Sequence, residues 1–149
     1  MSVSYDQFTN EFLSKITEFE FIHLTEDDRV SIVDGFMKRA ISEFRKNCKY
    51  DLSSTKDDEN REFHVDIPDY DLDEITNIVS EGMVVQWLKP YVNRQENLEN
   101  AISTRDYSLY SPAELLRRIA DVYQTTKKSY RQMIRDYSFD HGDLGELHL

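Results

Sequence analysis

The chain has 149 residues, of which 39% are hydrophobic and 12% aromatic, and its formal net charge is -11. This length and composition fit one globular domain with its own core, and the net charge disfavours non-specific binding to nucleic acid, which needs clustered lysine and arginine. The single cysteine and an N-terminus without a basic flank or apolar run predict a protein of a reducing compartment. No apolar run approaches the roughly 20 residues that span a bilayer, so no membrane segment is expected.

Two helices are predicted in the first 50 residues. A capping-box pattern at Ser4 precedes apolar residues at helical spacing, which predicts a helix over residues 4–18. Thr25 is followed by three acidic residues and then by an apolar stripe that runs to Cys48, which predicts a second helix. Gly35 inside this helix is interpreted as a point of close helix packing.

The segment 51–74 has a different composition, with ten acidic residues and two basic ones. It lacks a helical period, and we expect a long acidic surface loop that lies outside the helical core. Phe63, Val65 and Ile67 alternate with polar residues, which predicts a short strand that ends at Pro68. This strand could pair with an edge in another subunit.

A third helix, capped by Asp69 or Asp71, is predicted to carry the largest core side chain, Trp87. Gly82 in this helix would allow a neighbouring helix to approach closely. Pro90 removes one N–H and crowds the preceding turn, so we expect a kink or a stop just before it. A looser helical piece should follow.

The last helix, Ser111 to Tyr137, has the most complete signals, and we expect the chain to be organised around it. Its start offers a serine cap, a proline at the first helical position and a glutamate that closes a capping box. One side is apolar, and the opposite side is a mostly basic row: Arg117, Asp121, Gln124, Lys128, Arg131 and Arg135. This row could contact nucleic acid, but we favour an outward face that pairs with the acidic segment.

These elements predict a mainly α fold, a small bundle of about four to five helices. A single domain, 1–137, would carry the acidic loop 51–74 as an insertion, followed by an extended C-terminal tail, 138–149. The last helix should pack on the third, with these core residues: Met83, Trp87, Leu116, Ile119, Tyr123 and Ile134. Two glycines in the tail disfavour independent folding, and its apolar residues are predicted to anchor it on a partner: Phe139, Leu144, Leu147 and Leu149.

Motifs that carry catalytic chemistry were sought, and the patterns found argue against an enzyme. The best metal-ligand cluster lies on the glycine-containing tail, which offers no scaffold to fix it: His141, Asp143, Glu146 and His148. Residues 51–62 imitate the spacing of a calcium loop, but Lys56 stands where that loop needs glycine. The sequence has no glycine-rich phosphate loop and no nucleophile elbow. We therefore predict a protein that is not an enzyme and holds no metal or cofactor.

Three segments carry a resemblance to a known family: Ser80–Pro90, Tyr110–Ala113 and Arg135–Leu144. Together they resemble small virion proteins of tailed bacteriophages that infect Gram-positive hosts, in a pattern that covers about residues 75–149. The pattern is similar to that of head–tail connector proteins, also called adaptors or head-completion proteins. No motif of the acidic first half contributes to the resemblance.

The resemblance implies a structural protein of the virion neck that is assembled in the host cytoplasm. Such adaptors are small helical proteins that form a ring of about twelve copies beneath the portal protein, and their C-terminal tails reach into the portal. The ring would also bind the next neck or tail protein, and DNA would pass through its channel without sequence-specific binding. Acidic channel walls would suit that passage, because they repel the phosphates of the genome.

An alternative class is a small acidic intracellular helical module that binds a protein, for instance a phage-encoded regulator whose acidic segment mimics nucleic acid. A monomer without affinity for a portal would favour this alternative. An enzyme is the third class, which reproducible metal content would favour.

Overall fold

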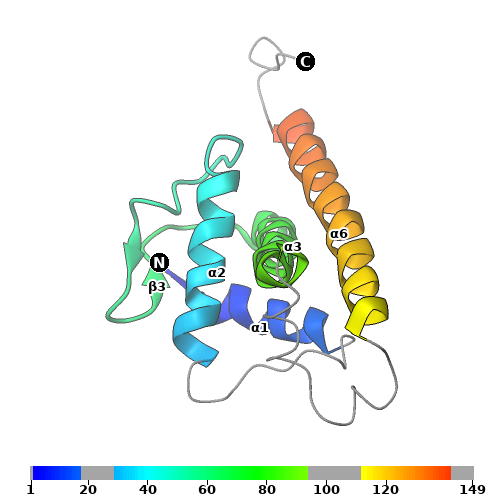
Figure 1. Ribbon diagram of the computed structural model, residues 1–149. Helices are drawn as coiled ribbons and strands as arrows, with labels where there is room; N and C mark the ends of the chain where they lie inside the picture. The colour runs from blue at the N-terminus through cyan, green and yellow to red at the C-terminus, as the bar shows by residue number, and fades with distance from the viewer. Residues whose placement is uncertain (1, 18–28, 94–111, 142–149) are drawn as a thin grey trace.

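The computed structural model describes residues 2–17, 29–93 and 112–141, and these ranges form a mainly α structure (Figure 1). The expected mainly α fold with a helical bundle is confirmed. In the described ranges the bundle has four helices: α1 (Tyr5–Ile16), α2 (Arg29–Phe44), α3 (Asp69–Asn93) and α6 (Pro112–His141). Three two-residue strands form a small sheet beside them: β1 (Val3–Ser4), β2 (Lys56–Asp57) and β3 (Glu62–Phe63).

Helix α3 is the centre of the bundle. It packs against α1, α2 and α6, and Figure 1 shows it in the middle of the other three. The consecutive residues Met83, Val84 and Val85 are all buried, and a helix that is apolar on every side must be covered on every side. The expectation that the last helix organises the chain is therefore wrong, because α6 has one polar face and lies at the periphery.

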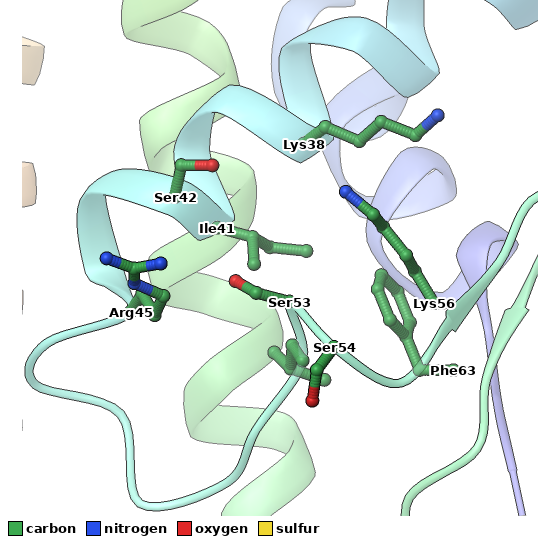
Figure 2. Close-up of a pocket in the computed structure, with 9 residues that line it drawn as sticks. Lys38, Ile41, Ser42, Arg45, Ser53, Ser54, Lys56 and Phe63 are labelled. Carbon is green, nitrogen blue, oxygen red and sulfur yellow. The ribbon is translucent and has the colours of Figure 1, made fainter.

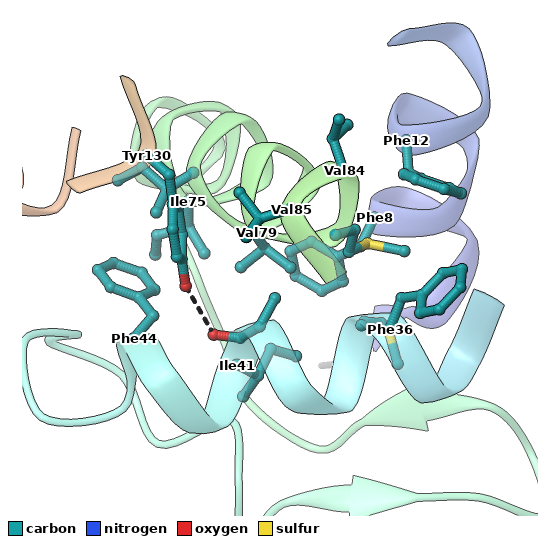
Figure 3. Close-up of a cluster of buried hydrophobic side chains, with 14 of the residues drawn as sticks. Phe8, Phe12, Phe36, Ile41, Phe44, Ile75, Val79, Val84, Val85 and Tyr130 are labelled. Atoms are coloured by element: carbon teal, nitrogen blue, oxygen red, sulfur yellow. Dashed lines mark hydrogen bonds between the residues drawn. The ribbon is translucent and has the colours of Figure 1, made fainter. Parts of the chain in front are cut away.

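The predicted close approach at Gly82 is confirmed, and α6 is the helix that makes it. A Cβ at Gly82 would lie 2.7 Å from two ring carbons of Tyr130. The Tyr130 hydroxyl reaches past α3 and donates a hydrogen bond to the backbone oxygen of Ala40 in α2 at 3.1 Å (Figure 3). The interpretation of Gly35 as a packing point is wrong, because a Cβ there would meet only the Arg39 guanidinium, at 3.7 Å.

The segment 51–74 contains the predicted short β segment at Phe63, but it does not lie outside the core as expected, and α3 begins within it at Asp69. Strand β3 is the middle strand of the small sheet, and it pairs antiparallel with β1 and β2 of the same chain rather than with another subunit. Phe63 of β3 is 1% exposed, and its ring packs on Tyr5 and Phe8 at centroid distances of 4.7 and 5.7 Å. Leu52 and Ile67 are also buried. This segment therefore contributes to the core through a few apolar side chains while its acids stay outside.

Several helix boundaries differ from those expected. Helix α2 ends at Phe44, whose carbonyl accepts hydrogen bonds from the next turn, so Cys48 lies beyond the helix. Helix α3 neither stops nor loses its helical state at Pro90, because the proline costs one hydrogen bond only a few residues from the end at Asn93. Helix α6 continues to His141, so the first four residues of the predicted tail are helical. The expected start at Thr25, the looser piece near residue 98 and the cap at Ser111 lie outside the described residues.

The predicted core residues lie where α3 and α6 meet their neighbours. Met83, Trp87, Ile119 and Tyr123 are buried, and Leu116 and Ile134 are partly buried against the same cluster. Helices α3 and α6 pack on each other as expected. Trp87 also reaches α1, because its ring meets Phe12 edge to face at a centroid distance of 6.1 Å.

Candidate functional site

The first candidate surface is the α6 basic stripe, which we define as Arg117, Lys128, Arg131 and Arg135. All four side chains are exposed, because the apolar positions between them turn toward α3. The expectation that this row pairs with the acidic segment is wrong for the described residues. Within these, none of the four forms an ion pair, and Arg135 only donates to the side-chain oxygen of Gln132, at 2.8 Å. The stripe is therefore open to a partner.

The second candidate surface is the acidic hairpin, which we define as residues 56–66, that is β2, β3, the turn between them and the three residues that follow β3. Figure 1 shows it on the opposite side of the bundle from α6, with α2 and α3 between. Glu59 and Asp66 are exposed and form no ion pair within the described residues, whereas Asp58 binds Lys38 at 2.8 Å. The subunit thus exposes carboxylates without ion-pair partners on one side and a mostly basic helix face, which also holds the exposed Asp121, on the other.

Arg61 fixes the acidic hairpin to the bundle. Its guanidinium donates two hydrogen bonds to the Asp34 carboxylate in α2, at 2.8 and 2.9 Å, and a third to Asp6 in α1, at 2.9 Å. Its carbonyl accepts the backbone N–H of Tyr5, and its φ of 52° is in the left-handed region. Sequence reasoning missed this role, because a lone arginine in an acidic run gives no sign of which distant carboxylates it will meet.

A buried polar contact ties the start of α3 to the chain after α2. Asp71 is 3% exposed, and its carboxylate accepts a hydrogen bond from the Tyr50 hydroxyl. This bond, with some burial, raises the pKa of Tyr50 to about 12. Nearby, the Tyr137 hydroxyl of α6 accepts the backbone N–H of Lys49 at 3.0 Å. Asp71 was expected as a helix cap, so its burial as a hydrogen-bond acceptor was not foreseen.

One cluster of metal-ligand types occurs in the described ranges, and it lies on the hairpin rather than on the tail. His64 lies between two carboxylates that are cross-strand partners, with Nε2 3.0 Å from Asp57 and Nδ1 3.7 Å from Glu62. The hydrogen bonds from Asn60 and His64 lower the pKa of Asp57 to about 2. Because the imidazole already bridges the two acids, these contacts account for the arrangement without a metal ion. Of the metal-ligand cluster expected on the tail, only His141 lies within the described residues. Its Nε2 is 3.3 Å from Oε1 of Glu74.

Large apolar side chains are exposed at three places on the described surface. Phe139, one of the predicted docking anchors, is 67% exposed near the end of α6, and Tyr70 is 76% exposed at the start of α3. Val30 and Ile32 are exposed at the start of α2. The other predicted anchors, Leu144, Leu147 and Leu149, lie outside the described residues. The docking role of Phe139 stays a prediction.

Comparisons with known proteins leave the resemblance as an expectation. No family model, no curated protein and no solved structure matches this chain. Among the described residues, no helix is long and apolar enough to cross a membrane.

Proposed function

We propose that this protein is a head–tail connector of a tailed phage, an adaptor ring beneath the portal that links the DNA-filled head to the tail. One observation supports a ring most directly: the α6 basic stripe and the acidic hairpin lie on opposite sides of the subunit. Opposite charges on opposite sides favour head-to-tail contact between identical copies. Such heterologous contacts generate a closed ring when the rotation per subunit divides the circle.

The resemblance of residues 80–90, 110–113 and 135–144 adds the identity of the ring. In this proposal the partners are neighbouring copies, the portal protein and the next neck or tail protein. Phe139 and the residues after α6 dock on the portal, and the remaining acidic surface faces passing DNA. No catalytic step is part of the proposal.

Charge reversal tests the ring. The double variant Arg131→Glu and Arg135→Glu should lower the oligomer mass, measured by light scattering after size exclusion, because like charges would then face each other across the contact. Adding Glu59→Lys and Asp66→Lys to the same chain should restore the oligomer mass, because opposite charges would again face each other across the contact. Lys89→Glu, an exposed charge outside both surfaces, is the control and should leave the mass unchanged. If the reversed stripe had no effect, the head-to-tail contact would be wrong.

A second experiment tests the portal contact. A chain that ends at His141 keeps the whole of α6, and we expect it to fold normally but to fail to attach to phage heads that already carry a portal. Attachment would be followed by electron microscopy of the purified heads. A full-length chain that stays monomeric and ignores the portal would favour the alternative, a helical module that binds another protein.

A further inference from the structure

A pocket of about 370 Å³ lies between the C-terminal half of α2 and residues 52–56 (Figure 2). Three cationic side chains line it, and no carboxylate does: Lys38, Arg45 and Lys56. The chain carries a net charge of -11, so three cations without a lining acid are an unusual local excess of positive charge. This pocket is separate from the α6 basic stripe, and it shares Lys56 and Phe63 with the acidic hairpin.

The acids nearest to the pocket already have partners. Asp58 accepts from Lys38 at 2.8 Å and from Tyr5 at 2.7 Å. The Asp51 carboxylate accepts hydrogen bonds from the Ser54 hydroxyl and amide, and these bonds lower its pKa. Arg45 and Lys56, by contrast, form no hydrogen bond or ion pair with the described part of the chain. Their positive charges are therefore compensated only at longer range.

The floor of the pocket is apolar. Ile41, Leu52 and Phe63 line it, and each is at most 5% exposed. Figure 2 shows Arg45 at one end and Lys56 at the other, with the side chain of Ile41 between them. Two serine hydroxyls, those of Ser42 and Ser53, also line the pocket and have no hydrogen-bond partner among the described residues. The pocket thus combines a central apolar surface with cations and hydroxyl donors at its edges.

We propose that this pocket binds a small organic anion, a carboxylate or phosphate group carried on a short apolar body. The anionic group lies against Arg45 or Lys56, where charge-assisted hydrogen bonds are strong and where the serine hydroxyls can donate as well. The apolar body lies on the floor formed by Ile41 and Phe63, and because these side chains are already buried, the apolar surface that leaves water is mainly that of the ligand. This site is formed within one chain and requires no partner subunit.

The test is a titration of the full chain by amide NMR with three probes: hexanoate, hexyl phosphate and inorganic phosphate. Both alkyl anions should give saturable shifts at the amides of residues 52–56, with at least tenfold higher affinity than inorganic phosphate because only they cover the apolar floor. The stronger of the two alkyl anions identifies the preferred head group. If inorganic phosphate bound as tightly as both, the apolar half of the proposal would be wrong.

Paired variants locate the site. Arg45→Gln with Lys56→Gln should weaken binding of the tighter-binding alkyl anion at least tenfold, since the pair removes whichever cation holds the anionic group by a charge-assisted hydrogen bond. Lys49→Gln with Lys89→Gln changes the net charge equally at exposed positions outside the pocket and outside both ring surfaces, and it should leave the affinity unchanged. All four side chains are exposed, so both double variants should keep the parent melting temperature. Equal weakening by the two pairs, or shifts that do not saturate, would overturn the proposal in favour of non-specific charge attraction.

Discussion

Replacing Gly82 with alanine should destabilise the bundle, although the same change usually stabilises a helix. Alanine in a helix interior is favoured over glycine by about 1 kcal/mol, because glycine loses more backbone freedom on folding. At Gly82 the added methyl would lie 2.7 Å from Tyr130 Cε1 and Cζ and 2.9 Å from its hydroxyl. No side chain accepts a contact that short, so either the tyrosine ring or the whole of α6 must move.

The structure limits how Tyr130 can respond. Its ring is 3% exposed between α3 and α6, and its hydroxyl is bonded to the Ala40 carbonyl. Overpacking a core of this kind costs about 1–3 kcal/mol, to which the lost hydrogen bond adds about 0.5–1.5 kcal/mol. After the gain in helix propensity of about 1 kcal/mol is subtracted, we expect Gly82→Ala to lower the free energy of unfolding by about 0.5–3.5 kcal/mol.

Urea denaturation followed by circular dichroism measures this effect, and Gly35→Ala is the matched control. Gly35 also lies inside a helix, but a Cβ there would have room, so this variant should gain up to about 1 kcal/mol. The two alanine variants should therefore shift the denaturation midpoint in opposite directions. If Gly82→Ala stabilised the protein as Gly35→Ala does, the close contact between α3 and α6 would be refuted.

Three further substitutions test other contacts. Tyr50→Phe leaves the buried Asp71 carboxylate without its donor and should cost about 1–3 kcal/mol in urea denaturation at neutral pH. Because the folded pKa of Tyr50 is raised from 10.0 to about 12, its stabilising effect is full below pH 10 and is lost as the pH rises toward 12, so the variant and parent should converge over that window. Arg61→Ala should cost about 1.5–3 kcal/mol, because it removes a bidentate bond to the partly buried Asp34, and an unchanged midpoint would show that the hairpin needs no such tie. Trp87→Ala should cost about 3–5 kcal/mol, and an unchanged melting temperature would contradict its place in the core.

The helices could be predicted because the spacing of apolar residues and the capping residues that indicate a helix lie within the helix's own sequence. The apolar side of α6 recurs every three or four residues, and its buried tyrosines, Tyr123, Tyr130 and Tyr137, all belong to that row. The close helix contact at Gly82 could be predicted as well, since a glycine in a strongly apolar helix commonly marks the close approach of a neighbouring helix. The same reasoning failed at Gly35, which shows that the identity of the residue does not reveal whether another helix faces it.

The contribution of the acidic segment 51–74 to the core was missed because its composition is dominated by side chains that remain in solvent. A two-residue strand buries one side chain, so Phe63 alone carries the contact of β3 with the core. No periodicity can develop over so short a length. The partner strand β1 is almost 60 residues away, and nothing in the local sequence specifies such a pairing. The network at Arg61 and the cationic pocket were missed for the same reason, because both bring α2 together with distant residues.

Helix α6 packs on the bundle through one face and carries the α6 basic stripe on the other. A substitution in the stripe can therefore test association between subunits without disturbing the packing of the helix. Its attachment to the bundle comes from Tyr130, which lies against Gly82 and bonds to Ala40, and from Tyr137, whose ring meets Phe44 at 5.0 Å. The cations of the α6 basic stripe point away from these contacts and form no ion pair within the described residues. Substituting a stripe arginine should therefore change association between subunits while leaving unfolding almost unchanged, since isolated exposed charges contribute little to stability. A change in oligomer mass that is accompanied by loss of stability would instead place those arginines in the folded core of the subunit.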